Sequence, residues 1–203
     1  NAPFEFKGYD VEIKHHNANS YTSNSGYIEL SDEKALQFSK ELNWFKRMFF
    51  LKPKMERLAE HLKFGAPNAA LVVSVHPELI ITALSTDFDA AMLLRFPAHF
   101  VSKFDLEVGS ALVSINTYGY REYGIQVDLK EGPNATGIYG ICYPAIGDFL
   151  ATEISQARAV ASELARAEYE RLLELAELRL KEPDPFIRNG NPFLSANAPF
   201  KEI

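Results

Sequence analysis

Two aspartates and two histidines form the best candidate for a metal site in this sequence. Asp87 and Asp89 are two residues apart, so in an extended segment both carboxylates would point to the same side. His76 and His99 flank them, and carboxylates with an imidazole are ligands for a divalent ion. A metal-dependent hydrolase centred here is one hypothesis. The alternative is a polar turn between strands at residues 85–87. Because no short His or Cys spacing supports a metal, we assign no metal ligand and no cofactor.

A second candidate is a cluster of three tyrosines around one arginine. Tyr118, Tyr120, Arg121 and Tyr123 are close together, and glycines flank the cluster. Tyrosine offers a large contact area with a polar tip, while arginine stacks on aromatic rings and donates to carboxylates or phosphates. The pattern predicts a recognition surface at the end of a hairpin. The alternative is a twisted hairpin that carries its tyrosines on a half-buried face.

Other signatures of catalysis are missing from the sequence. It has no CxxC pair, HExxH, GxSxG, P-loop or GxGxxG motif. Cys142 is the only cysteine, so no intrachain disulfide can form. Its apolar neighbours indicate a small buried side chain and not a nucleophile. A non-catalytic binding or protein-interaction module is therefore the leading hypothesis.

The overall charge narrows the class of partner. The chain of 203 residues has a formal net charge of −6, which disfavours a phosphate backbone unless basic residues are segregated. The densest basic group, Lys52, Lys54 and Arg57, is diluted by two glutamates. A protein or a small molecule is the expected partner. No stretch approaches the roughly 20 apolar residues of a membrane span. The cytoplasm is the default expectation for location, and a removed leader is left open.

Two helical segments are predicted before the sheet. Apolar residues spaced three and four apart predict a helix over residues 32–51, with Ser31 as its N-cap. We expect four of them to be buried against the sheet: Phe38, Leu42, Phe45 and Phe49. Pro53 is expected to break or kink this pattern, and a second helix to continue to about residue 63.

The sheet is predicted from short β-branched or alternating runs. The spacings between these runs leave little room for crossover helices, so most neighbouring strands should pair antiparallel. The predicted strands cover residues 4–7, 9–13, 27–30, 71–75, 79–84, 90–96, 111–115, 125–129 and 138–143.

A single long helix is predicted over residues 148–181, because no Gly or Pro interrupts its apolar stripe. Thirty residues at the helical rise would span roughly 45 Å, more than the diameter of a domain of this size. Such a helix must kink, project, or pack against another chain. It is therefore a candidate for homo-oligomerisation through Leu164, Leu172, Leu175 and Leu178.

The tail after residue 182 repeats a Pro-Phe pair every seven residues. We expect Phe186, Phe193 and Phe200 to dock into apolar hollows of the domain or of a partner chain. The sequence thus predicts one α+β domain over residues 1–203. Two helical segments cover its mostly antiparallel sheet, and residues 183–203 form an extended tail.

Overall fold

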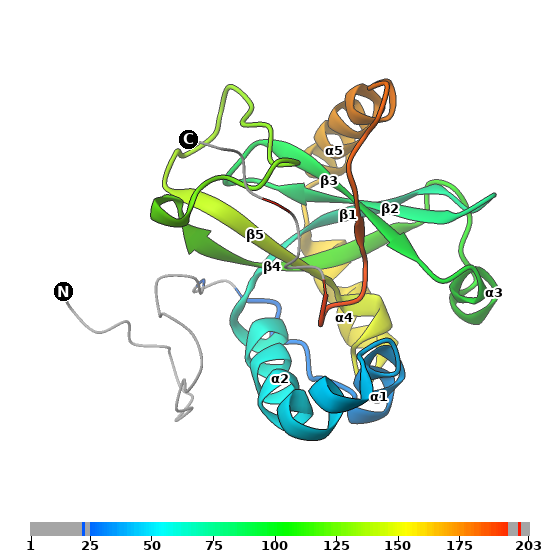
Figure 1. The fold of residues 1–203 in the computed structure, drawn as a ribbon. Coiled ribbons are helices and arrows are strands. Elements are labelled where there is room, and N and C mark those ends of the chain that lie inside the picture. Colours follow the sequence, from blue (N-terminus) through cyan, green and yellow to red (C-terminus); the bar gives the residue numbers. More distant parts are fainter. Residues whose placement is uncertain (1–21, 23–24, 195–198, 200–203) are drawn as a thin grey trace.

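A six-stranded, strongly curled sheet forms the centre of the computed structural model (Figure 1). The structure describes residue 22, residues 25–194 and residue 199. The predicted strands at residues 4–7 and 9–13 lie outside these ranges. The strand order is β5-β4-β1-β2-β3-β6. The strands are β1 (Ala66–Ser74), β2 (Leu79–Ser85), β3 (Ala90–Phe96), β4 (Ala111–Tyr120), β5 (Tyr139–Ile146) and β6 (Ile187–Asn189).

The pairing of the strands confirms a mostly antiparallel α+β fold. Strands β1 to β5 pair antiparallel with their neighbours, while the short β6 adds parallel to β3. One predicted strand is wrong, because residues 125–129 form an irregular turn. Around residues 27–30 the structure has a single bridge, between Leu30 and Ala151.

The first predicted helix is two helices, α1 (Asp32–Ser39) and α2 (Trp44–Phe64). Ser31 caps α1 as predicted, since its hydroxyl accepts a hydrogen bond from the Lys34 amide at 3.3 Å. The break at residues 40–43 changes the phase of the apolar stripe. Phe38 and Leu42 are buried as predicted, whereas the burial predicted for Phe45 and Phe49 is wrong.

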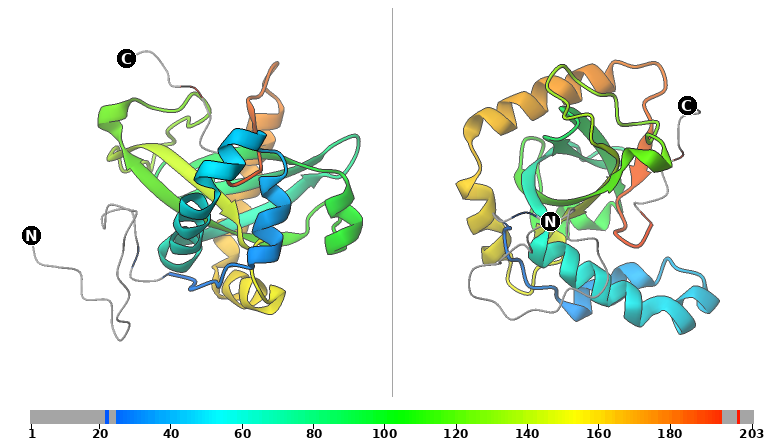
Figure 2. Two further views of the ribbon diagram at one scale, coloured as in Figure 1. Left: turned by 60° about the horizontal axis from the view of Figure 1, so that its bottom comes forward. Right: turned by 90° about the vertical axis from the view of Figure 1, so that its left-hand side faces the viewer.

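The helix predicted over residues 148–181 is also divided. After the short η3 (Gly147–Phe149) come α4 (Ile154–Glu163) and α5 (Arg166–Leu180), separated by Leu164 and Ala165 in extended conformation. The corner lets α4 pack on β4 while α5 packs across β1, β2 and β3. Figure 2 shows both helices outside the curl of the sheet. The predicted segment is helical but not continuous, and of the three alternatives the structure shows a sharp corner within it.

This corner also affects the four leucines that were predicted to form a homo-oligomer interface. Leu172 is fully buried against the sheet, and Leu164 and Leu175 pack beside it. Leu178 is 63% exposed. The four leucines therefore do not form a common exposed stripe, and self-association of the chain stays a prediction.

The sheet has two differently covered faces. Residues such as Leu71, Leu84 and Ala91 contact α5 on the convex face. Their neighbours along the strands point into the curl, where Met92, Leu94 and other side chains form the main core. Two smaller helices, α3 (His99–Phe104) and η2 (Arg121–Tyr123), lie at opposite ends of the sheet (Figure 1).

The tail supplies the last strand and part of the core. Phe193 is buried in the main cluster, as predicted, and Phe186 is half-buried. Phe200 lies outside the described residues. Among the helices that the structure describes, none has both the length and the apolar character that a membrane crossing requires.

Candidate functional site

The predicted tyrosine cluster is divided between the core and the surface. Tyr118 points into the curl of the sheet and is only 8% exposed. Its ring stacks on Tyr139 at a centroid distance of 5.0 Å, and Tyr120 also stacks on Tyr139, at 5.9 Å. Burial raises the pKa of Tyr118 well above its usual value. Tyr118 therefore contributes to packing, while Tyr120 is half-buried.

Arg121 is exposed but already has a partner. Its guanidinium donates two hydrogen bonds to the Glu131 carboxylate, at 2.6 and 3.1 Å. The side chain of Tyr123 is outside the described part of the structure. A partner carboxylate at Arg121 would have to compete with Glu131. Recognition through Tyr118, Tyr120, Arg121 and Tyr123 stays a prediction.

The four residues of the candidate metal site do not converge. Asp87 and Asp89 lie in the turn between β2 and β3, whereas His76 precedes β2 and His99 follows β3. Because these strands are antiparallel, both histidines lie at the opposite end, roughly 20 Å away for seven extended residues. Within the described ranges, no group of three His, Cys, Asp or Glu side chains is placed to hold a metal ion.

Each aspartate instead has a structural partner. Arg171 of α5 donates to both carboxylate oxygens of Asp89, at 3.0 and 2.9 Å, and this contact lowers the pKa of Asp89. Burial raises the pKa of Asp87, against the effect of hydrogen bonds from Tyr118 and Thr136. The turn between β2 and β3 is thereby fixed to α5 and to β4.

Sequence reasoning missed a buried ion pair whose arginine connects the two edge strands of the sheet, β5 and β6. Arg188 of β6 donates to both oxygens of Asp128, at 2.5 and 2.8 Å, and both side chains are almost fully buried. Arg188 also donates to the Cys142 carbonyl of β5 at 2.7 Å and to the Gln126 side chain at 3.0 Å. Gln126 and Asp128, both predicted on a strand, instead accept hydrogen bonds from Arg188. An arginine within the tail was the available signal.

Two hollows lie beside the α4–α5 corner. The first, of about 430 Å³, is lined by residues of α3, β4, α4 and α5, with the buried Asp148 at its wall. Asp148 accepts a hydrogen bond from the Val113 amide at 3.0 Å, and burial raises its pKa. The second, of about 460 Å³, lies between β1 and α5 and is mainly apolar. Tyr169 lines both hollows, and its hydroxyl donates to the Leu112 carbonyl at 3.1 Å.

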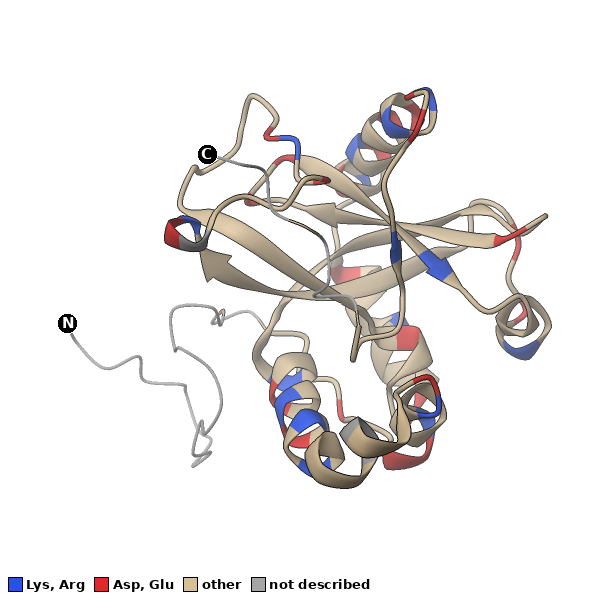
Figure 3. Ribbon diagram, in the orientation of Figure 1, with Lys and Arg blue, Asp and Glu red and all other residues tan. Residues whose placement is uncertain are grey.

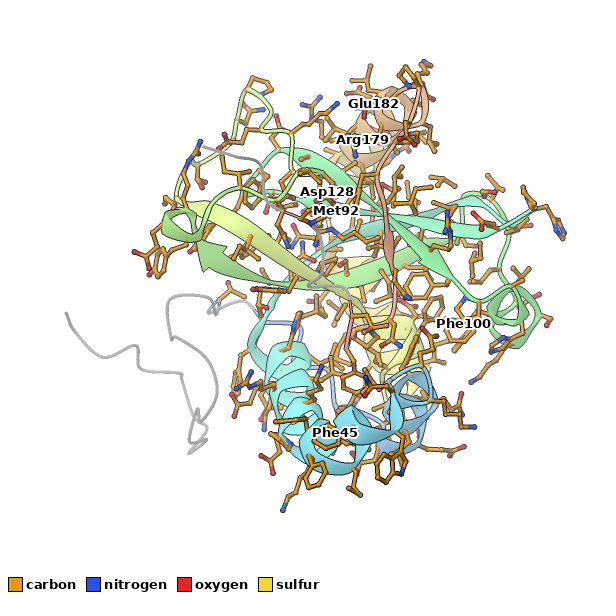
Figure 4. The ribbon with its side chains drawn as sticks, viewed as in Figure 1. Phe45, Met92, Phe100, Asp128, Arg179 and Glu182 are labelled. Atoms are coloured by element: carbon orange, nitrogen blue, oxygen red, sulfur yellow. The ribbon has the colours of Figure 1, made fainter. Side chains whose placement is uncertain are left out.

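The first two turns of α2 expose an unusual group of large apolar side chains. We call Trp44, Phe45, Met48, Phe49 and Phe50 the α2 aromatic surface. Trp44 is 73% exposed, and the other four are 50% to 57% exposed. The rings of Phe45 and Phe49 contact each other at a centroid distance of 4.8 Å. Phe45 lies at the opposite end of the molecule from Arg179 and Glu182 (Figure 4).

The burial of α2 changes along its length. Its buried side chains, Leu58, His61, Leu62 and Phe64, belong to the second half, which packs on the sheet. His61 is held there by the Ile115 carbonyl, 2.7 Å from its Nε2 atom. Two phenylalanines of the first half satisfied the spacing of a buried helix face. The sequence held one sign of their exposure. The helix predicted over residues 32–51 is long, and its first part, with Phe38 and Leu42, already covers the core.

Comparison with known proteins finds no significant match to any family model, curated protein or solved structure.

Proposed function

We propose that this protein is a non-catalytic interaction module that binds its partner through the α2 aromatic surface. The observation that supports this is the exposure of five large apolar side chains within seven consecutive residues. Single exposed apolar residues are normal on a folded protein, whereas a contiguous group marks a site of association. Tryptophan, phenylalanine and methionine are also the residue types enriched at binding surfaces.

The energetics favour an association role for this surface. Burying a fully exposed phenylalanine or methionine contributes about 1.5–3 kcal/mol, and the four such side chains here, 50% to 57% exposed, would each contribute about half of that. Together with Trp44, they would offset part of the cost of association. The same side chains contribute little to the fold while they remain in water. A surface of this kind affects binding more than stability.

The test is the double variant Phe45→Ser/Phe49→Ser. Because both rings are exposed, we expect its free energy of unfolding to stay within about 0.5 kcal/mol of the parent. Truncation of the buried Phe38 to Ala should instead cost about 3–5 kcal/mol. Urea denaturation measures both. If the double variant loses as much stability as Phe38→Ala, the surface is packed within the chain and the proposal fails.

A second measurement examines the accessibility of the apolar surface with the amphiphilic anionic dye anilinonaphthalene sulfonate. The parent should enhance its fluorescence, and the Phe45→Ser/Phe49→Ser variant should lose most of that enhancement. The matched control replaces two isolated apolar residues, Ile138→Ser/Leu178→Ser, which are 54% and 63% exposed. The control should bind dye like the parent. Equal dye binding by all three proteins would contradict the proposal.

A further inference from the structure

The first half of α2 combines its apolar side chains with an unusual local charge. Residues 44–54 contain four basic residues, Lys46, Arg47, Lys52 and Lys54, and no acidic one. Of these, the half-buried Lys54 donates to the Phe193 carbonyl at 3.3 Å, whereas Lys52 is exposed. The whole chain has a net charge of −6, so this segment has the opposite sign to the molecule. Figure 3 shows basic residues along α2 together with acidic ones, and the sequence places those acidic residues, Glu56 and Glu60, after residue 54. The occupant of this surface is therefore expected to be both apolar and negatively charged.

The arrangement of the apolar side chains narrows the choice of occupant. A helix held in the groove of a partner protein presents one stripe, with anchors at i, i+3, i+4 and i+7. At about 100° per residue, Trp44 and Met48 lie on one side of α2, Phe45 and Phe49 lie about 100° further round, and Phe50 lies about 100° beyond them. The exposed side chains thus surround much of the helix, which suits a fluid phase better than a single groove.

The position of the segment allows it to reach a flat surface. The described side chains of residues 44–50 are all exposed, and the first half of α2 lies on the side of the molecule away from α5 (Figure 2). Aromatic rings favour the boundary between headgroups and acyl chains, where lysine can bury its stem and keep its ammonium group in water. Anionic headgroups attract the neighbouring basic residues.

We infer that the α2 aromatic surface docks on an anionic bilayer, with Trp44 and the phenylalanines at the level of the headgroups. This inference rests on the proposed function, since it names the occupant of the same surface. The acidic remainder of the molecule would be repelled by the same headgroups, so docking is limited to this end of the chain. The interaction is peripheral.

The experiment uses the full chain with phosphatidylcholine vesicles, prepared with and without phosphatidylserine. Trp44 is the only tryptophan, so its emission reports on this surface alone. With phosphatidylserine we expect co-sedimentation and a blue shift of Trp44 emission, and weak binding without it. Lys52→Gln should weaken binding roughly fivefold, the effect of one basic residue at an anionic surface. Phe45→Ser/Phe49→Ser should abolish binding, and Ile138→Ser/Leu178→Ser should leave it unchanged.

Three results would overturn the inference. The first is no binding to phosphatidylserine vesicles by a parent that passes the dye test, in which case the proposed function stands and its occupant is a protein. The second is vesicle binding that the Phe45→Ser/Phe49→Ser variant retains. The third is a blue shift of Trp44 that depends on protein concentration and not on lipid, which would identify a second copy of the chain as the occupant. Failure of the dye test removes both proposals.

Discussion

At the scale of single residues, the central feature is the buried pair of Arg188 and Asp128. A buried ion pair contributes little net stability when its geometry is poor, because desolvation opposes the attraction between the charges. Here both carboxylate oxygens are engaged, and the remaining guanidinium hydrogens reach Gln126 and the Cys142 carbonyl. The pair joins the tail, the 125–129 turn and the edge of β5.

We predict that Asp128→Ala lowers the free energy of unfolding by about 3–5 kcal/mol, because it leaves the Arg188 charge buried without its carboxylate. The matched control is Glu131→Ala, which removes the carboxylate from an exposed arginine, Arg121. Such surface pairs contribute about 0–1 kcal/mol. Urea denaturation compares the two variants. Similar losses in both would contradict a structural role for the buried pair.

Cys142 yields a prediction about alkaline pH. Burial raises the pKa of its thiol from 9.0 to about 12. Between these values the unfolded chain has lost this proton and the folded chain keeps it, so stability should fall as the pH rises through this window. Below pH 9 the thiol is protonated in both states, and its contribution to stability is fully present.

The measurement is the urea midpoint of the parent and of Cys142→Ala at about pH 8 and about pH 10. The variant should lose less stability than the parent over this interval. Some dependence on pH should remain, since burial also raises the pKa of Tyr169 to about 12. Identical slopes for parent and variant would show that Cys142 is not protected by burial.

At the scale of elements, the two helix corrections have different causes. The break at residues 40–43 has no Gly or Pro to announce it, and the stripe in the sequence continues across it. Pro53, which should interrupt a helix, lies inside α2. The corner at Leu164 and Ala165 likewise has no local signal. Packing on a curved sheet decides both breaks, and periodicity carries no information about that curvature.

We predict that Pro53→Ala stabilises the protein. Proline has no N–H for the Phe49 carbonyl and is the least favourable residue in a helix interior, so alanine should raise the free energy of unfolding by up to about 3 kcal/mol. Pro183→Ala, beyond the end of α5, is the control and should change little. A urea midpoint for Pro53→Ala at or below that of the parent would show that α2 requires its proline.

The strands were more predictable than the helices. The runs at 79–84, 90–96, 111–115 and 138–143 coincide with β2, β3, β4 and β5, because buried strands use a narrow set of residue types. The strand predicted at residues 125–129 is wrong, although its apolar and polar residues alternate regularly. Its inward residues, Gln126 and Asp128, are polar, and they face the buried Arg188 where a strand would present apolar groups.

The candidate sites could be predicted only in part. Asp87 and Asp89 are neighbours in the structure as in the sequence, but antiparallel strands separate them from His76 and His99. Of the tyrosine cluster, Tyr118 is enclosed by the curl of the sheet. Two residues of the α2 aromatic surface, Phe45 and Phe49, are predicted as core, since exposed and buried apolar residues look alike in a sequence when both occur at helical spacing.

At the scale of the whole molecule, the surface that we propose for association lies at the opposite end from the α4–α5 layer (Figure 2). The curled sheet, its buried ion pair and the α4–α5 layer hold the fold. The first two turns of α2, at the other end, expose five large apolar side chains, and the next turn packs Leu51 against the core. This separation is what allows variants of the α2 aromatic surface to be tested without unfolding the protein.

The most direct test of the central claim is the quenching of Trp44 by acrylamide in the isolated chain at low concentration. Trp44 is the only tryptophan and is 73% exposed, so its emission reports on the α2 aromatic surface alone. If that surface is open to a partner, the indole should emit as it does in water and be quenched almost as readily as free tryptophan. A blue-shifted emission protected from acrylamide would show that the chain covers this surface itself, and would contradict the account.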